Sequence, residues 1–184
     1  MRLFEIKNHF LNKTILLLVL FSCNFFTDSS PNRVFELIGL NANKIPQSFE
    51  RVFKEYYQQK QDGSLQALAE DQKSMRSSNC VDAVNFYYGS TFKEDIKKIN
   101  ALSKTDETEP IIKAGIELFE YAQEVQSNDF PKIAKMIDDG KSQEEINLAA
   151  KQLDDTKGIE LDKKYKKVMD LLIAEGYRVK KIGG

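Results

Sequence analysis

The chain contains no tryptophan, a single histidine and two cysteines among its 184 residues. The histidine, His9, lies near the N-terminus in a segment that is both cationic and apolar. Histidine is the commonest general base, the commonest transition-metal ligand and the usual partner of a catalytic serine or cysteine. With one histidine placed outside the main body of the chain, histidine-dependent hydrolase and zinc-site chemistry have little support.

The first 23 residues have the organisation of a bacterial export signal. Positive charge comes first, and an apolar run follows over residues 15–21. The segment ends in Leu20-Phe21-Ser22-Cys23, which resembles the lipobox of bacterial lipoproteins. In that family the cysteine thiol is diacylated, the bond before it is cut and the new amino terminus is usually acylated. The resemblance covers this targeting segment only, and it implies that Cys23 is lipidated.

Two other interpretations of this segment are an uncleaved signal anchor and an ordinary signal peptide that is cut elsewhere. The apolar run is short for an anchor, because a helix needs about 20 apolar residues to span a bilayer core of roughly 30 Å. We therefore predict a signal peptide over residues 1–22, a lipidated cysteine and flexible tether over residues 23–32, and a single helical domain over residues 33–184.

The predicted anchor defines a location and one partner. Diacylglyceryl and acyl groups on Cys23 would hold the domain to a membrane. Asn24 stands where enterobacterial lipoproteins retained in the inner membrane carry aspartate, so the resemblance favours the outer membrane of the cell envelope. The cell surface and the periplasmic face remain open alternatives.

Cleavage before Cys23 would change the chemistry of the domain. It removes three basic residues, one acidic residue and His9, and it leaves 24 basic and 27 acidic residues. A mildly acidic domain is not expected to bind nucleic acid. With Cys23 acylated, Cys80 is the only free thiol, so no intramolecular disulfide can form. We expect Cys80 to be a buried and inert residue.

Helical periodicity dominates the rest of the chain. It predicts an all-α helical bundle of five to seven helices. The expected elements are a helix from Pro46 to Asp62-Gly63, one capped by Ser64, one after Ser90 or Thr91, an apolar helix from Pro110, a short helix up to Asp138-Asp139-Gly140, a helix with a Ser142–Glu145 capping box, and a last helix that breaks or kinks near Gly158 and ends at Gly176. Residues 80–88 are a doubtful strand.

Two groups of residues are candidates for ligand binding. Tyr87 and Tyr88 precede a turn, where stacked tyrosines could bind a sugar ring or a peptide; the alternative is core packing, as expected for Tyr56 and Tyr57. The second group could meet an acidic partner, or could form a solvated helix face that complements an acidic neighbour. It comprises Lys163, Lys164, Lys166 and Lys167.

No catalytic residue, metal ligand or cofactor site is nominated. Asp138-Asp139 and Asp154-Asp155 lack the alternating oxygen-donor spacing of a calcium loop, so we interpret them as a turn and an exposed helix face. The favoured function is a lipid-anchored, non-catalytic binding or structural module with a protein or glycan partner. The alternative is a periplasmic inhibitor or immunity protein. A carboxylate-based enzyme ranks last, because no pair of facing acids is apparent.

Overall fold

The computed structural model describes residues 30–69, 71 and 73–182, and these residues form a helical bundle. The all-α prediction is therefore confirmed. The elements are α2 (Pro31–Val34), the π-helix η1 (Phe35–Leu40), α3 (Phe49–Asp62), β1 (Gln66–Leu68), β2 (Met75–Ser77), α4 (Cys80–Tyr88), α5 (Lys93–Asn100), α6 (Glu109–Asn128), α7 (Phe130–Asp138), α8 (Gln143–Leu153), the π-helix η2 (Asp154–Gly158) and α9 (Ile159–Ile182). Helix α2 begins at Pro31, inside the range 23–32 that the sequence assigned to a tether.

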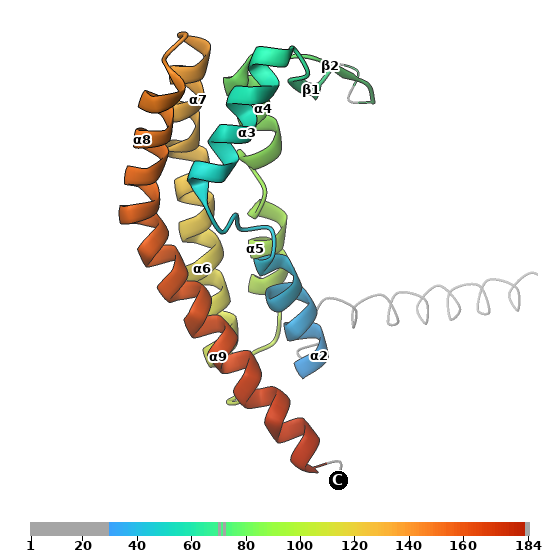
Figure 1. Cartoon of the computed structure of the whole chain (residues 1–184). Coiled ribbons are helices and arrows are strands. Elements are labelled where there is room, and N and C mark those ends of the chain that lie inside the picture. The colour runs from blue at the N-terminus through green and yellow to red at the C-terminus, as the bar shows by residue number, and fades with distance from the viewer. Residues whose placement is uncertain (1–29, 70, 72, 183–184) are drawn as a thin grey trace, which may run out of the picture.

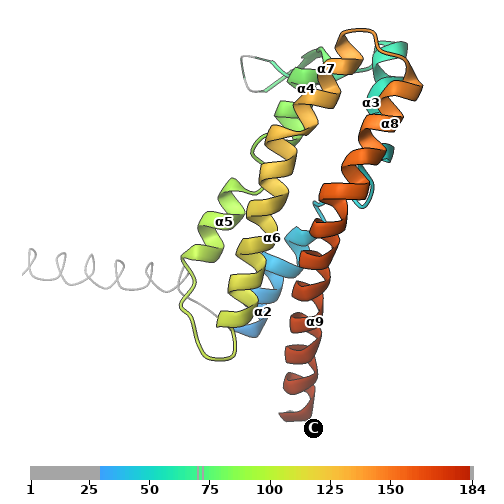
Figure 2. The ribbon, with the colours of Figure 1, turned by 90° about the vertical axis from the view of Figure 1, so that its left-hand side faces the viewer.

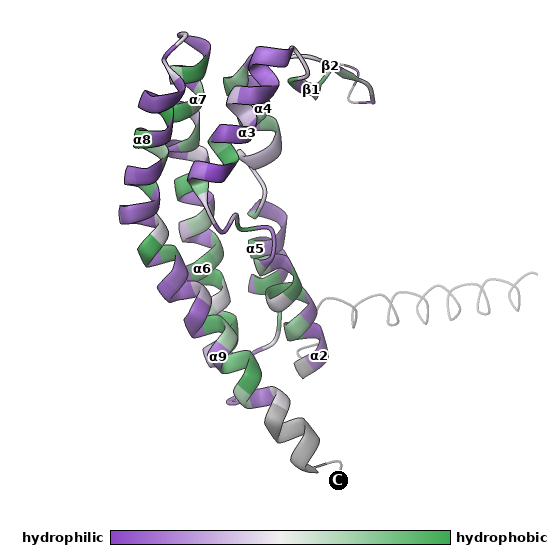
Figure 3. Cartoon of the chain, viewed as in Figure 1, coloured by the Kyte–Doolittle hydropathy of each residue, from purple (hydrophilic) through white to green (hydrophobic). Residues whose placement is uncertain are grey.

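Helix α6 is the centre of the bundle, as its apolar sequence predicts. It packs against α9, α5, α7 and α4, and Figure 2 shows α5, α6 and the α8–α9 rod side by side. Its buried face includes Leu118, Phe119 and Ala122, none of which is exposed to solvent. Hydrophilic residues cover the outward faces of α3 and α8 (Figure 3). The core therefore follows the helical stripes that the sequence carries.

Two ends of the molecule can be distinguished in Figures 1 and 2. One end carries α2 and the C-terminal part of α9. The opposite end carries the turn between α7 and α8, the C-terminal end of α3 and the β1–β2 hairpin. The N-terminal and C-terminal parts of the described chain thus lie at the same end of the bundle.

Helix α3 agrees in most respects with the helix that the sequence predicts after Pro46. It ends at Asp62, and Gly63 follows with φ +73°, a left-handed conformation that glycine adopts without strain. Its N-terminus is shifted from the predicted Pro46 to Phe49, because the Ser48 side chain accepts a hydrogen bond from the Arg51 backbone N–H at 3.2 Å. The capping box between Ser142 and Glu145 at the start of α8 is present as predicted.

The segment after Gly63 does not form the predicted helix. It forms an antiparallel hairpin in which Ala67 pairs with Arg76. Asp71 organises the connecting turn, since its carboxylate accepts hydrogen bonds from the backbone N–H groups of Lys73 (2.9 Å) and Ser74 (3.0 Å). This turn therefore forms without the Asn-Gly pair that signals many β-hairpins in a sequence.

Residues 80–88 form helix α4 rather than a strand. The Asn79 side chain accepts a hydrogen bond from the Asp82 backbone N–H at 2.7 Å, and a second cap comes from Asp138 at the end of α7. Because both caps satisfy N–H groups that the first helical turn leaves free, they stabilise the helix.

The last helix follows its prediction only in part. The chain does not break near Gly158: residues 154–158 adopt a π-helix, and α8, η2 and α9 form one continuous rod (Figure 1). Gly176 does not end the helix, which continues to Ile182. No neighbouring atom lies within 4 Å of the position of a Cβ at Gly176, so this glycine faces open space inside the helix.

Candidate ligand-binding groove

Helices α3 and α4 enclose a surface groove of about 410 Å³, which we call the tyrosine groove. Three of its lining side chains are tyrosines, and two of these are the candidates predicted from the sequence. The groove is lined by Lys44, Val52, Glu55, Tyr56, Gln59, Tyr87, Tyr88 and Thr91. The structure therefore joins Tyr87 and Tyr88 to a third tyrosine that the sequence assigned to packing.

The position of Tyr88 follows from the aromatic core. Its ring packs edge to face on Phe130, with centroids 5.1 Å apart, and Phe130 packs in the same way on Phe49 and Phe53. Tyr56 lies 6.5 Å from Tyr88 in a further edge-to-face pair. These contacts fix the two inner rings of the groove.

Tyr87 occupies the rim of the groove. Consecutive helix residues point about 100° apart, so Tyr87 faces outward where Tyr88 faces the core, and Tyr87 is 51% exposed. Its ring contacts Phe86 edge to face at 4.8 Å. Both tyrosines belong to the last turn of α4 rather than to a loop. Tyr87 is the aromatic ring of the groove that is most accessible to a ligand.

The connection that follows α4 is held by one side chain of α6. Gln123 accepts a hydrogen bond from the Phe92 backbone N–H at 3.0 Å and donates one to the Gly89 carbonyl at 3.0 Å. Thr91 donates its hydroxyl hydrogen to the Tyr87 carbonyl at 2.8 Å. This connection is thereby anchored to the central helix, beside the rim of the groove.

The opposite end of α4 is capped by Asp138 of α7. Its carboxylate accepts hydrogen bonds from the backbone N–H groups of Cys80 (2.9 Å) and Val81 (3.0 Å), and from the Lys60 ammonium (3.1 Å). Burial favours a higher pKa for Asp138, but these three donors outweigh it and hold the pKa below its usual value. Asp138 was interpreted from the sequence as part of a turn, and its cap on α4 is a tertiary contact.

Asp154 makes the equivalent contact for α3. Its carboxylate oxygens accept hydrogen bonds from the backbone N–H groups of Phe49 (2.8 Å) and Glu50 (3.0 Å). The sequence assigned Asp154 to an exposed helix face, and the structure corrects this: it caps a helix more than 100 positions earlier in the chain. The two helices that form the groove are thus both capped by carboxylates from the C-terminal half.

None of the three groove hydroxyls is among the buried, unpaired polar atoms of the described residues. Burial raises the pKa of Tyr56 and of Tyr88 above the usual tyrosine value, with smaller contributions from nearby groups. Within residues 30–69, 71 and 73–182, the hydroxyls of Tyr56, Tyr87 and Tyr88 have no hydrogen-bond partner. Each hydroxyl is free to donate one hydrogen bond and to accept others.

The charged residues of the groove are paired. The Lys44 ammonium lies 2.8 Å from a carboxylate oxygen of Asp95, a buried residue, and Glu55 accepts a hydrogen bond from Arg51 at 3.1 Å. Glu55 is the one carboxylate among the described lining residues.

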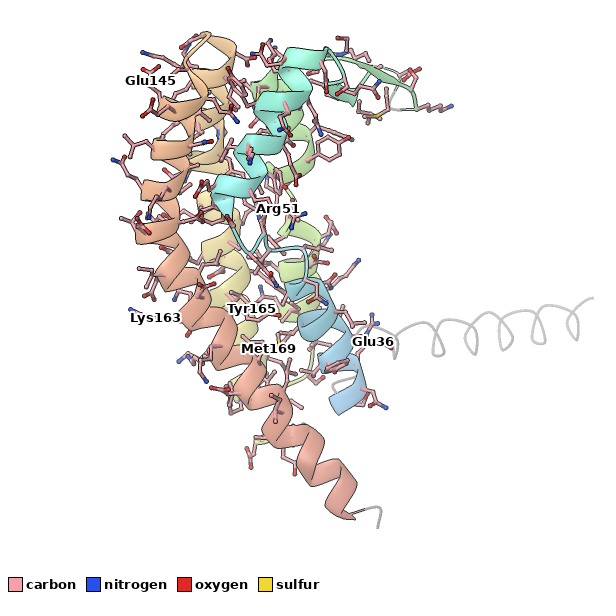
Figure 4. The ribbon with its side chains drawn as sticks, in the orientation of Figure 1. Glu36, Arg51, Glu145, Lys163, Tyr165 and Met169 are labelled. Atoms are coloured by element: carbon pink, nitrogen blue, oxygen red, sulfur yellow. The ribbon has the colours of Figure 1, made fainter. Side chains whose placement is uncertain are left out.

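A second recess of about 700 Å³ adjoins the tyrosine groove. Val52 and Glu55 line both, and the recess continues past Arg51 to Tyr165 of α9. Figure 4 shows Arg51 at the start of α3 and Tyr165 on the side of α9 that faces α2. Sequence reasoning missed this recess, because its walls come from two parts of the chain that are far apart in the sequence, residues 42–55 and 161–165.

The predicted lysine cluster lies elsewhere, on α9. Lys163 and Lys164 lie 3.7 Å from Glu160, Lys166 lies 2.7 Å from Asp170, and Lys167 lies 3.1 Å from Glu117 of α6. Lys163 points outward from the bundle in Figure 4. None of the four lysines lines the tyrosine groove, and each lies beside a carboxylate, with Lys163 and Lys164 sharing Glu160. This arrangement matches the alternative of a solvated helix face.

Cys80 is fully buried, as predicted. Burial together with the Asp138 charge raises the pKa of its thiol to about 12.

The described residues hold no cluster of three or more metal-ligating side chains. No helix among them is both long and apolar enough to cross a bilayer. Cys23 and Asn24 lie outside the described residues.

No family model, no curated protein and no solved structure matches this chain.

Proposed function

We propose that the protein is a lipid-anchored lipoprotein of the bacterial cell envelope, and that its helical domain is a non-catalytic binding module that uses the tyrosine groove. The observation that supports a binding role is the convergence of three tyrosines in one groove, whose hydroxyls make no hydrogen bond to the described residues. The sequence Leu20-Phe21-Ser22-Cys23 supports the anchor and its outer-membrane location.

A neutral saccharide is the ligand class that suits the groove best. Aromatic faces pack on the apolar faces of sugar rings, and the neutral hydroxyls of Tyr56 and Tyr88 can pair with sugar hydroxyls. The amide of Gln59 adds further donors and an acceptor. Because the charges of Lys44 and Glu55 are already paired, the groove offers no net charge to a strongly ionic ligand.

The binding proposal is tested by screening the domain on an array of neutral and acidic oligosaccharides, followed by calorimetric titration of the best neutral binder. We expect Tyr87→Ala to weaken binding about tenfold, which corresponds to about 1.4 kcal/mol. Phe35→Ala is the matched control, because Phe35 is an equally exposed ring on another segment and does not line the groove. Equal effects of the two variants would contradict the assignment of the site.

A second pair of variants tests the hydroxyl groups without removing a ring. We expect Tyr88→Phe to weaken saccharide binding, because it deletes a groove hydroxyl, and Tyr57→Phe to leave the binding constant unchanged, because Tyr57 does not line the groove. A domain that binds peptides and no saccharide on parallel arrays would overturn the ligand class.

The anchor has its own test. We expect metabolic labelling with palmitate to mark the wild-type protein, and Cys23→Ala to abolish the label and to release the domain from the membrane fraction. Retention of the label in the Cys23→Ala variant would refute lipidation at this residue.

A further inference from the structure

The α2–η1 segment exposes large apolar side chains at the N-terminal end of the described chain. Phe35 is 50% exposed and Leu40 is 53% exposed. Leu40 follows Phe35 by five positions in the π-helix η1, and residues i and i+5 of a π-helix lie about one turn apart. The side chains of Phe35 and Leu40 therefore point toward roughly the same side of η1.

The apolar surface continues onto α9. A Cβ built at Gly39 would lie 3.2 Å from both the Phe35 ring and Leu172 Cδ1, so these two side chains meet above Gly39. Ile173, the next residue of α9, is 57% exposed. Figure 4 places Met169 on the side of α9 that faces α2. An apolar surface of this kind commonly marks contact with a partner or a membrane.

The short length of chain between Ser30 and the proposed acyl anchor favours a membrane as the partner of this surface. Ser30, the first described residue, is seven positions after Cys23. Seven residues span at most about 25 Å, even when fully extended. Phe35 follows five residues later, and five helical residues rise about 8 Å. If Cys23 carries acyl chains in a bilayer, Phe35 is therefore within about 33 Å of Cys23 along the chain and can reach the surface of that bilayer.

We propose that the apolar surface of Phe35, Leu40 and Leu172 rests in the interface of the bilayer that holds Cys23, a proposal that depends on the lipidation proposed above. The acyl anchor raises the effective concentration of this surface at the membrane, so that a few side chains suffice for contact. The two charged residues that flank Phe35 in the sequence, Arg33 and Glu36, form an internal pair at 3.1 Å. Contact with neutral phospholipid therefore needs no anionic headgroup.

The proposal fixes the orientation of the domain. The end that carries α2 and the C-terminal part of α9 faces the membrane, and the end with the α7–α8 turn and the hairpin points away (Figure 1). Helices α3 and α4, which form the tyrosine groove, lie toward the distal end. The groove is thereby presented to ligands rather than to lipid.

The absence of tryptophan from the whole chain allows a direct test. The acylated full chain is purified from membranes as the Phe35→Trp variant and reconstituted into phosphatidylcholine vesicles with brominated acyl chains. The Leu148→Trp variant is the matched control, because Leu148 is an equally exposed apolar residue on α8. Leu40→Trp repeats the test at the second position, and circular dichroism verifies the fold of each variant.

We expect a blue shift and bromine quenching of fluorescence in the Phe35→Trp and Leu40→Trp variants, and neither change in Leu148→Trp. Vesicle-bound protein that is unquenched at both test positions, or equally quenched at all three, would overturn the proposed orientation. A blue shift without quenching would overturn it too, and would indicate a protein contact at this surface. Failure of the wild type to float with vesicles, with no acyl group by mass spectrometry, would refute the anchor itself.

Discussion

Replacement of Asp138 by asparagine tests whether helix α4, with its two groove tyrosines, depends on a cap from α7. In the wild type, the two carboxylate oxygens accept from the backbone N–H groups of Cys80 and Val81, and Lys60 adds a third donor. An asparagine amide has one accepting oxygen. Whichever way it is placed, its NH₂ group faces an N–H donor, and a helix N–H loses its partner.

The expected loss of stability is about 2 kcal/mol. Charge-assisted hydrogen bonds contribute about 1.5–3 kcal/mol, and loss of a helix cap costs about 0.5–2 kcal/mol. The Lys60 ion pair adds little, because its side chain is 36% exposed. For a domain of this size, the midpoint of thermal unfolding should fall by roughly 4–8 °C. Urea denaturation followed by circular dichroism measures the change in free energy.

Asp139→Asn is the control, because the neighbouring carboxylate only pairs with Lys135 on an exposed helix face. Such pairs contribute about 0.3–0.5 kcal/mol. If Asp138→Asn shifts the urea midpoint no more than Asp139→Asn does, the cap does not stabilise the fold and the reasoning is wrong.

The pH dependence gives a second check on the same residue. Because the pKa of Asp138 is lowered in the folded protein, its stabilisation is fully present above the unfolded aspartate pKa of about 3.9 and is lost as the pH falls through the lower folded value. The difference between wild type and Asp138→Asn should therefore be constant from pH 5 to pH 7 and shrink below about pH 4. A difference that persists at low pH would assign the effect to packing.

Three further predictions concern side-chain burial and the space around two glycines. In a Cys23→Ala background, the Cys80 thiol, whose pKa burial raises to about 12, should not react with Ellman's reagent at pH 8 until guanidinium unfolds the protein; rapid native reaction would refute its burial. Gln126→Leu should raise stability by about 1 kcal/mol, because the buried amide has no partner among the described residues, and a loss in urea denaturation would contradict this. Gly115→Ala should lower the free energy of unfolding by about 1–2 kcal/mol, because the new Cβ would lie 2.7 Å from Ile38 Cδ1. Gly176→Ala should raise it by about 0.5–1 kcal/mol, because no neighbouring atom lies within 4 Å of its Cβ position. Equal urea midpoints for these two variants would contradict the close approach of η1 to α6.

The sequence predicted those elements whose signals are local. The apolar stripe of α3, the apolar helix α6 and the capping box at Ser142 each depend on residues a few positions apart, and each is present in the structure. Helix α4 was not predicted, because one of its two caps is Asp138, which lies 58 positions after Cys80. A contact over that separation leaves no periodicity in the sequence.

Only part of the tyrosine groove was predictable, because some of its residues have a local signal in the sequence and others do not. Tyr87 and Tyr88 stand out in the sequence as adjacent aromatic residues before a turn. Tyr56 belongs to the α3 stripe, and the same spacing that predicts its burial conceals its place in the groove. Gln59 and Lys44 join the groove only when α3 packs beside α4.

The contacts that position the groove come mainly from residues that do not line it. Phe130 supports the Tyr88 ring, Gln123 holds the connection after α4, and Asp138 caps the start of α4. All three belong to α6 and α7, whereas the groove is formed by residues 44–91. Substitutions at these supporting positions should therefore change ligand binding without removing a contact to the ligand. In the proposed orientation the groove also lies away from the bilayer, so the C-terminal helices determine the shape of the site while the acyl anchor determines where it is presented.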